Sequence, residues 1–409
     1  MVELLSPAGN MEKLRAVIDY GADAVYLAGK AFGMRAASDN FTDEELAVAA
    51  EYVHSRGKKL YVTLNVMPRT KEYLSLGKMI DTVNAIGAHG VIAGDIGVIS
   101  LIRERAPLLP IHLSTQACAV SAAACRAWHK LGVGRIVLAR ELTLDEIREI
   151  RADTPESLEL EVFIHGSMCI SYSGRCLLSN YLTGRDANRG NCVQPCRWNY
   201  GVSHIEMTEE HRQGERFSVF EDAHGAYIMS SRDLCMIEHV PAIMSAGINS
   251  FKIEGRMKST YYGALVTNAY RIAIDRYEKD PTAYINDPAL LHELCSVSHR
   301  EYCTGFFFGN PMEDAAVVSE TGYLREKAYL AIAEEYNFKD GRALFRQRNK
   351  LVCGEAAELI SPGKTGRRIL IDDMRTPEGE ALQNAPHPDM KFTIRVPFEI
   401  KTGDILRGV

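Results

Sequence analysis

The sequence of 409 residues predicts an α/β protein, a (β/α)8 TIM-like barrel with a cysteine-rich insertion after strand 7 and a small C-terminal β-barrel domain. Three observations predict this fold. Glycines that end helices precede short β-branched runs, eight apolar runs alternate with helical patterns, and the pattern changes to short strands and turns near Tyr329. A doubly wound open sheet would produce the same alternation, but the count of eight favours a closed barrel.

Each βα unit of the predicted barrel has a recognisable start. A glycine after a helix adopts the left-handed cap, and the β-branched run behind it is typical of a buried parallel strand. Helical patterns such as Asp43–Arg56 and Thr143–Arg151 separate the strands. The eight strand candidates are the runs that follow Gly21, Gly87, Gly132 and Gly247, together with Val2–Leu5, Lys59–Val66, Ile111–Ser114 and Leu160–His165.

The spacing of these elements predicts the domain boundaries. Residues 1–165 and 248–280 form the barrel, and the connection 166–247 is far longer than a normal βα unit of about 30 residues, so we expect an inserted subdomain there. Lys258–Tyr277 reads as a helix, and 281–328 as a connector. Short strands between 329 and 409 predict the small β-barrel.

Polar side chains follow most of the predicted strands. In a (β/α)8 barrel the chemistry lies at the carboxyl ends of the strands. The residues at these ends are Ser6, Asn65, Asp95, Ser114, Gln116, Arg140, Glu141, His165, Lys252, Glu254 and Arg256.

Composition excludes several classes of protein. The net charge of −6 excludes a globally basic nucleic-acid binder, although it leaves a local basic patch open. The most apolar run, Val91–Ile102, contains Asp95 and is shorter than the roughly 20 apolar residues of a membrane span. The N-terminal residues lack a secretory signal, so we expect a cytoplasmic protein without membrane contact. In that reducing compartment, the 10 cysteines would be buried thiols, catalytic thiols or metal ligands.

Five of these cysteines lie in the insertion, in irregular chain rich in Gly, Ser and Asn: Cys169, Cys176, Cys192, Cys196 and Cys235. Four thiolates that converge would suit zinc or an iron–sulfur cluster. Only the spacing of Cys192 and Cys196 is tight, which favours a cluster over a zinc ribbon. A catalytic thiol and simple packing remain alternatives. Packing is the expected role of the isolated cysteines, Cys118, Cys125, Cys295, Cys303 and Cys353.

The same insertion is locally basic and aromatic. Between Gly166 and Tyr200 the only acidic residue is Asp186. Guanidinium groups neutralise phosphates and aromatic rings stack on unpaired bases, so this segment could face RNA. Alternatively, the arginines could offset the charge of a cluster or bind a small anion. The residues concerned are Arg175, Arg185, Arg189 and Arg197, with Tyr172, Tyr181, Trp198 and Tyr200.

One long motif carries a family resemblance. Residues 161–179, EVFIHGSMCISYSGRCLLS, resemble the signature of the collagenase-like peptidase family U-32. The resemblance extends through Leu5–Gly9, His112–Gln116, Ala139–Leu142 and Phe251–Lys258. Length and the C-terminal β domain look most like the members involved in tRNA hydroxylation, which install 5-hydroxyuridine at the wobble position with prephenate. The resemblance therefore implies an enzyme that hydroxylates tRNA.

The resemblance also implies a [4Fe–4S] cluster. Carried over by motif, its ligands would be Cys169, Cys176, Cys192 and Cys235, with Cys196 in reserve. The expected partner is the tRNA anticodon loop, bound by the arginine- and aromatic-rich insertion, with a second RNA contact from the C-terminal domain. A homo-oligomer or a hetero-oligomer with a family paralogue is a further expectation.

The strand-end residues complete the predicted site. The two carboxylates of prephenate call for paired cations, which Arg140, Lys252 and Arg256 could supply, and His165 could move a proton. Internal ion pairs of these cations with Asp95, Glu141 or Glu254 are the alternative. The predicted catalytic set is His165, Arg140, Glu254, Lys252 and Arg256.

Two other functions remain open. The family name suggests proteolysis, but His292-Glu293 lacks the second His of a zinc-protease motif and the chain has no Gly-x-Ser-x-Gly elbow. For a peptidase, Ser167 or Cys169 beside His165 would be the expected nucleophile. The other alternative is a non-catalytic iron–sulfur protein that scaffolds or passes electrons to a partner.

Overall fold

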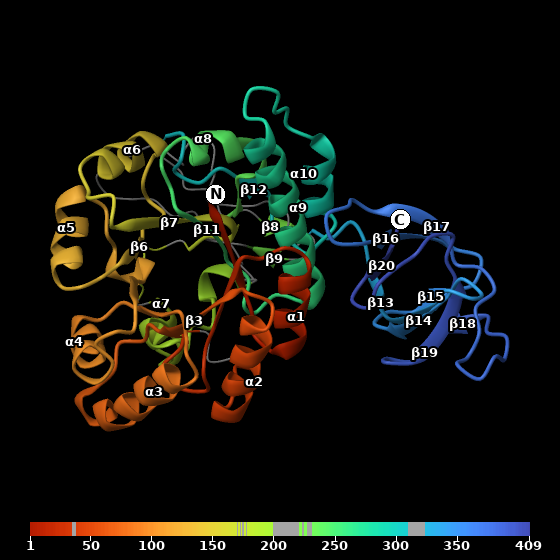
Figure 1. The fold of residues 1–409 in the computed structure, drawn as a ribbon, viewed down its shortest axis with the longest axis horizontal. Helices are drawn as coiled ribbons and strands as arrows, with labels where there is room; N and C mark the ends of the chain where they lie inside the picture. Colours follow the sequence, from red (N-terminus) through yellow and green to blue (C-terminus); the bar gives the residue numbers. More distant parts are fainter. Residues whose placement is uncertain are drawn as a thin grey trace.

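The computed structural model describes residues 1–34, 38–169, 171, 173, 176, 178–198, 221–222, 225–226, 231–309 and 324–409. Eight parallel strands form its centre, and the pairing of β11 with β7 closes them into a barrel (Figure 1). The predicted (β/α)8 barrel is therefore confirmed, and the open sheet is excluded. In order around the barrel, the strands are β1 (Glu3–Pro7), β2 (Ala24–Leu27), β3 (Lys59–Leu64), β4 (Gly90–Ala93), β5 (Ile111–Leu113), β6 (Arg135–Val137), β7 (Glu159–Ser167) and β11 (Ser250–Ile253).

Helices surround the barrel (Figure 1). They are α1 (Met11–Asp19), α2 (Asp43–His54), α3 (Tyr73–Ala85), α4 (Ile96–Arg105), α5 (Ala122–Lys130), α6 (Leu144–Ala152), α8 (Val240–Met244), α9 (Thr260–Lys279) and α10 (Pro288–Cys295). Side-chain caps fix where they begin: Thr42 and Thr143 each accept a hydrogen bond from a backbone N–H in the first turn of α2 and α6. None of the helices in the described part of the chain combines the length and apolar character that crossing a bilayer requires.

A β-bulge in β7 changes which face its residues present. Phe163 lies opposite Lys252, but Ile253 lies opposite His165, so Ile164 is an extra residue in β7. Side chains alternate between the two faces of a strand, and one inserted residue reverses the alternation beyond it. Glu161 and Phe163 consequently share the inner face with Lys252, whereas His165 shares the outer face with Ile253.

The last part of the predicted insertion belongs to the barrel wall. Strand β10 (Asp233–Cys235) pairs antiparallel with the end of β7, and β12 (Tyr302–Cys303) adds a parallel strand to β10. Helix α8 then leads into β11. The described part of the insertion before Ser231 holds α7 (Leu178–Thr183), short 3-10 turns at Ala187–Arg189 and Pro195–Arg197, and the small pair β8 (Glu221–Asp222) and β9 (Gly225–Ala226).

The C-terminal domain is a curved antiparallel sheet. Its strands are β13 (Tyr329–Asn337), β14 (Arg342–Gln347), β16 (Ala356–Ile360), β17 (Arg367–Leu370), β19 (Lys391–Arg395) and β20 (Ile405–Gly408), with a small separate pair, β15 (Leu351–Val352) and β18 (Asn384–Ala385). In the order β17-β16-β20-β13-β14-β19, the described strands leave β17 and β19 as edges. The predicted small β domain is confirmed, and it is a half-barrel rather than a closed barrel.

This half-barrel packs against α1, α9 and α10 (Figure 1). The hydroxyl of the buried Tyr20, which directly follows α1, donates to the carbonyl of Ile360 at 2.9 Å, and Arg407 donates to Glu293 of α10 at 2.8 Å. Ile360 and Ile405 belong to the same apolar core as the barrel. The two domains therefore share a continuous core, which fixes the C-terminal domain beside the start of α9.

Candidate functional site

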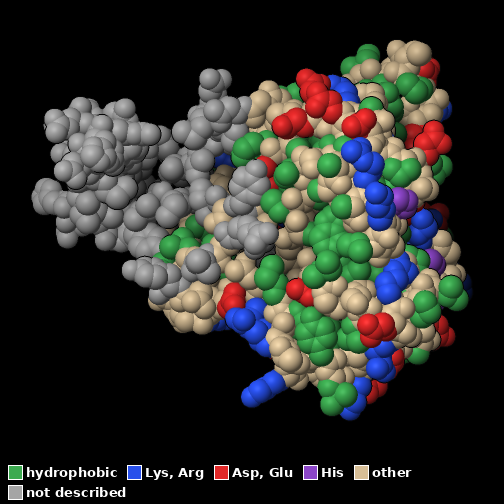
Figure 2. Space-filling view, turned by 90° about the vertical axis from the view of Figure 1, so that its left-hand side faces the viewer, with side chains coloured by type: hydrophobic (Ala, Val, Ile, Leu, Met, Phe, Trp, Pro, Cys, Tyr) green, Lys and Arg blue, Asp and Glu red, His purple; other side chains and the backbone are tan. Residues whose placement is uncertain are grey.

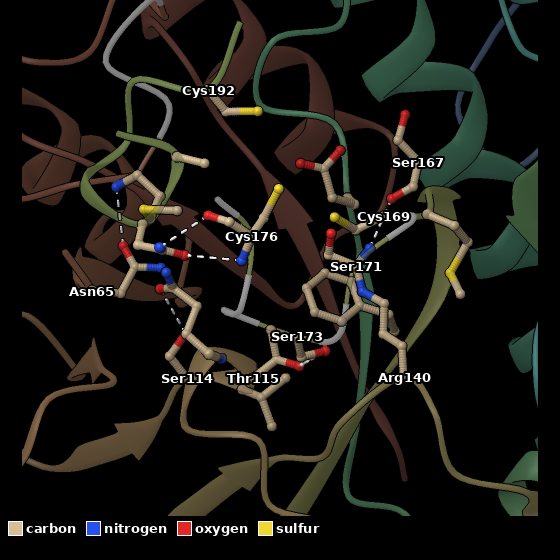
Figure 3. Close-up of a pocket in the computed structure, with 18 of the residues that line it drawn as sticks. Asn65, Ser114, Thr115, Arg140, Ser167, Cys169, Ser171, Ser173, Cys176 and Cys192 are labelled. Atoms are coloured by element: carbon tan, nitrogen blue, oxygen red, sulfur yellow. Dashed lines mark hydrogen bonds between the residues drawn. The ribbon is translucent and has the colours of Figure 1, made fainter. Parts of the chain in front are cut away.

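A cavity of about 290 Å³ lies at the carboxyl ends of the barrel strands (Figure 3). The barrel supplies its floor and the insertion covers it, as the position of such sites in (β/α)8 barrels predicts. Ser6, Asp95 and His165 lie elsewhere. The predicted strand-end residues that line the cavity are Asn65, Ser114, Gln116, Arg140, Glu141, Lys252, Glu254 and Arg256.

Four cysteines from the insertion line the same cavity: Cys169, Cys176, Cys192 and Cys196. The sulfur atoms of the first three point toward a common space in Figure 3. The Asn188 side chain fixes the backbone of Cys176, because its amide nitrogen donates to the Cys176 carbonyl at 3.1 Å and its oxygen accepts from the Cys176 N–H at 3.5 Å. The Cys192 sulfur accepts from the backbone N–H of Gln194 at 3.3 Å.

Cys235 does not reach this cavity. It lies in β10 opposite His165, is only 8% exposed, and contacts the Tyr270 hydroxyl through its sulfur at 4.0 Å. Burial raises the pKa of this thiol to about 12. Strand pairing with β7 thus places Cys235 in the apolar core, apart from the other predicted ligands, and its role as the fourth ligand stays a prediction. The reserve candidate, Cys196, lies with the other three.

His165 is also turned away from the cavity. Beyond the bulge it packs among the rings of Tyr262, Tyr270 and Tyr302 at centroid distances of 5.3–5.9 Å, and it is 1% exposed. Burial lowers the pKa of its imidazole to about 3. The structure does not bring His165 to the cavity, so its predicted role in proton transfer gains no support from the geometry. His165 is therefore not positioned to act as a general base for Ser167 or Cys169, and the proposed peptidase arrangement loses its support.

Lys252 connects the cavity to a buried charge network in the barrel. Its ammonium donates to Glu161 at 2.7 Å, and Glu161 also accepts from Arg135 at 3.2 Å. Burial by itself raises the pKa of the Glu161 carboxyl, but the charges of Lys252 and Arg135 hold that pKa below its usual value. Lys252 thus has the internal carboxylate partner that the alternative interpretation expected, although the partner is Glu161.

Arg140 and Arg256 bring two guanidinium groups to the cavity wall. Arg140 donates to the carbonyl of Ser167 at 2.7 Å and lies over the Phe163 ring at 4.0 Å. Arg256 is 3% exposed and donates to the Thr63 hydroxyl at 3.1 Å. These contacts fix both side chains, so the two positive charges have defined positions beside the cavity.

Two carboxylates lie in the same wall. Glu141 accepts from the backbone N–H of Ser173 at 2.8 Å and from its hydroxyl at 3.1 Å, and so ties the insertion to the end of β6. The backbone of Glu254 is held by the His165 carbonyl at 2.9 Å and the Tyr262 hydroxyl at 3.0 Å. The predicted set therefore divides: Arg140, Lys252, Glu254 and Arg256 meet at the cavity, and His165 does not.

The basic residues of the insertion have different roles from one another. Arg189 donates to both oxygens of Glu72, at 2.9 and 2.7 Å, and to the Met67 carbonyl at 3.0 Å. It anchors the insertion to the loop after β3 rather than facing RNA. Arg185 is exposed, and the indole of Trp198 donates to the Val193 carbonyl at 3.0 Å. Arg175, Tyr172 and Tyr200 and the side chains of Tyr181 and Arg197 lie outside the described residues.

Sequence reasoning missed several residues of the site. Asn188 and Ser173 support the cysteine loop through hydrogen bonds, and Phe306 enters from beyond α10. The density of polar residues around Cys192 was a signal for Asn188. Phe306 lies within the predicted connector 281–328, so no local pattern pointed to it as a site residue.

The matches to known proteins cover nearly the whole chain. The model of "Peptidase family U32" matches residues 9–316, and that of "Peptidase family U32 C-terminal domain" matches residues 325–407. The chain is 35% identical to "tRNA hydroxylation protein P1" of Bacillus subtilis, over 99% of this chain and 94% of that protein. It is also 35% identical to "tRNA hydroxylation protein P" of Escherichia coli, over 98% and 94%. A "Collagenase" of Porphyromonas gingivalis is 30% identical over 91% and 90%. The chain belongs to peptidase family U32.

Proposed function

We propose that this protein hydroxylates tRNA with the help of an iron–sulfur cluster, converting the wobble uridine to 5-hydroxyuridine with prephenate as co-substrate. One observation carries the proposal: four cysteines and three cationic side chains line the same cavity at the catalytic end of the barrel. The relatives named for tRNA hydroxylation match over almost the full length of both chains, which supports the same substrate class.

The cysteine set fits a cluster better than a single ion. Only Cys192 and Cys196 are closely spaced in the sequence, whereas a zinc ribbon has two tight cysteine pairs. A cluster of four irons suits a wider set, since each thiolate binds a different iron. We therefore assign Cys169, Cys176, Cys192 and Cys196 as its ligands. Replacing C–H by C–OH on a uracil ring is a two-electron oxidation that also needs an oxygen atom, so the co-substrate prephenate would have to supply the oxygen and take up the two electrons. The cluster would supply the one-electron chemistry that side chains lack.

The protein's own residues would bind and orient the reactants. Prephenate carries two carboxylates, and the positions of Arg140 and Arg256 allow one guanidinium for each. Lys252, already neutralised by Glu161, would add a hydrogen-bond donor rather than a net charge. Glu254 at the cavity wall would accept a hydrogen bond from a uracil N–H or from a hydroxyl group.

Two measurements test the proposal. Protein purified without oxygen should contain about four irons and four sulfides per chain, and protein with a single zinc instead would contradict the cluster. In a deletion strain, nucleoside mass spectrometry of tRNA should show loss of 5-hydroxyuridine derivatives, and the gene for the intact protein should restore them. Unchanged derivatives in a strain without a second pathway would contradict the substrate.

A further inference from the structure

A second cavity of about 520 Å³ lies next to the first, where the barrel, the insertion and the C-terminal domain meet. The two cavities share a wall formed by Ser167, Gln194 and Glu254. Ser167 lies on the side of the first cavity away from Asn65 in Figure 3. A ligand too long for the first cavity could therefore continue into the second.

The second cavity has the groups that bind a phosphate. Lys258 and Arg325 bring positive charge from two elements far apart in sequence. The Lys258 ammonium donates to the Ser298 carbonyl at 3.1 Å and lies 3.9 Å from Asp233, which fixes its position. Arg325 is exposed, and its guanidinium has no ion pair among the described residues. An anion is the ligand that would complete this arrangement.

The helix α9 adds to the positive potential. It is 20 residues long, and its N-cap, Ser259, lines the second cavity. The N-terminus of a long helix carries partial positive charge and favours anions. Glu254 stands in the wall between the cavities, so a phosphate is favoured at the Lys258 and Arg325 side.

The remaining walls come from the C-terminal domain and from aromatic residues. Tyr261 of α9 and Tyr329 of β13 stack with ring centroids 5.3 Å apart, and the Asn349 side chain donates to the Tyr329 carbonyl at 2.6 Å. The cavity therefore combines cations, amide and hydroxyl groups with aromatic edges. Nucleotides in single-stranded RNA are recognised by such mixtures.

We propose that the second cavity binds the nucleotide next to the one that is modified, with its phosphate beside Lys258 and Arg325. This inference rests on the proposed function, because it extends the same RNA from the first cavity. It gives the C-terminal half-barrel a role as one wall of the substrate site.

By contrast, the face of the barrel around α5 mixes acidic and basic side chains (Figure 2), so its outer helices are less suited to bind a polyanion.

The test measures binding of a fluorescent anticodon stem–loop RNA to the full, anaerobically purified chain at several salt concentrations. Arg325→Ala should weaken binding about five- to tenfold and reduce the magnitude of the salt slope by about 0.7, the value for one lost phosphate contact on a single strand. Asn349→Asp, which adds a negative charge to the opposite wall, should weaken binding as well. The matched control, Arg368→Ala, removes an exposed arginine of the same domain outside both cavities and should bind normally.

A chemically modified RNA can show which phosphate contacts Arg325. Replacing one of the two phosphates that flank the target uridine with an uncharged methylphosphonate should weaken binding to the intact protein and leave binding to Arg325→Ala unchanged. Normal RNA binding by Arg325→Ala and Asn349→Asp would overturn the inference and leave the proposed function standing. A raised KM for prephenate in Arg325→Ala, with unchanged RNA affinity, would also overturn the inference and would indicate that the second cavity binds a small anion. Failure of the intact protein to bind any RNA would instead contradict the proposed function.

Discussion

The interior of the barrel and its mouth are built in different ways. In the interior, Glu161 contacts both Lys252 and Arg135, and all three side chains come from strands. At the mouth, Arg140 and Arg256 contact a carbonyl and a hydroxyl, and the cover is an insertion held by a few polar contacts. Charged groups in the interior therefore stabilise the fold, whereas charged groups at the mouth are positioned to bind a ligand.

The largest effect is expected from removal of the interior carboxylate, Glu161. Glu161→Ala leaves the ammonium of Lys252 buried without that partner, so the free energy of unfolding should fall by about 3–5 kcal/mol. Urea denaturation measures the change. The double variant Glu161→Leu/Lys252→Met should recover much of the loss, because it leaves neither charge uncompensated. A loss below about 1 kcal/mol for Glu161→Ala would contradict the structural role.

At the mouth, the corresponding change should act on binding rather than on stability. Arg140→Ala removes a guanidinium from the cavity wall, and a charged hydrogen bond is worth about 1.5–3 kcal/mol. The KM for prephenate should therefore rise about 10- to 100-fold while the melting temperature stays within a few degrees. Steady-state kinetics and thermal unfolding check the two parts. Arg148→Ala on the exposed face of α6 is the control.

The stability of the protein should depend on pH through His165, which lies on the outer face of β7. Because the pKa of His165 is about 3 when folded and near 6.5 when unfolded, the unfolded chain binds the extra proton between these values. Stability should thus fall as the pH drops below 6.5, by about 2 kcal/mol from this residue at pH 5. Burial also lowers the pKa of His112, which adds to the slope.

The variant His165→Asn should make the pH dependence of unfolding shallower by one proton, whatever it does to stability at neutral pH. The same substitution at the exposed His387 is the matched control. An unchanged slope in His165→Asn would mean that the imidazole exchanges protons with solvent and is not enclosed.

The smallest expected effect concerns the anchor of the insertion. Glu72→Gln breaks the pair with Arg189, in which both side chains are partly exposed, so stability should fall by less than about 1 kcal/mol. The insertion would be held less firmly, and iron should be lost to a chelator several times faster. Equal rates of iron loss would show that the remaining contacts suffice to hold the cysteine loop.

Much of this fold could be predicted from the sequence, because parallel strands and capped helices are local patterns. The glycines after helices located four strands, and the helical patterns Asp43–Arg56 and Thr143–Arg151 located α2 and α6. The sequence could not place residues whose positions depend on tertiary structure. Simple alternation places His165 inside the barrel, but the extra residue Ile164 turns it outward. Cys235 lies in β10, which pairs with β7 of the barrel sheet. Its spacing from Cys192 in the sequence does not predict this pairing.

The measurement that tests the central claim most directly is the iron and acid-labile sulfide content of Cys196→Ala and Cys235→Ala, purified without oxygen, with electron paramagnetic resonance of the reduced proteins. The account predicts that Cys196→Ala loses the four-iron signal and most of its iron. Cys235→Ala should keep both, with at most a loss of stability from a small cavity in the core. Retention of the cluster in Cys196→Ala with its loss from folded Cys235→Ala would contradict the account.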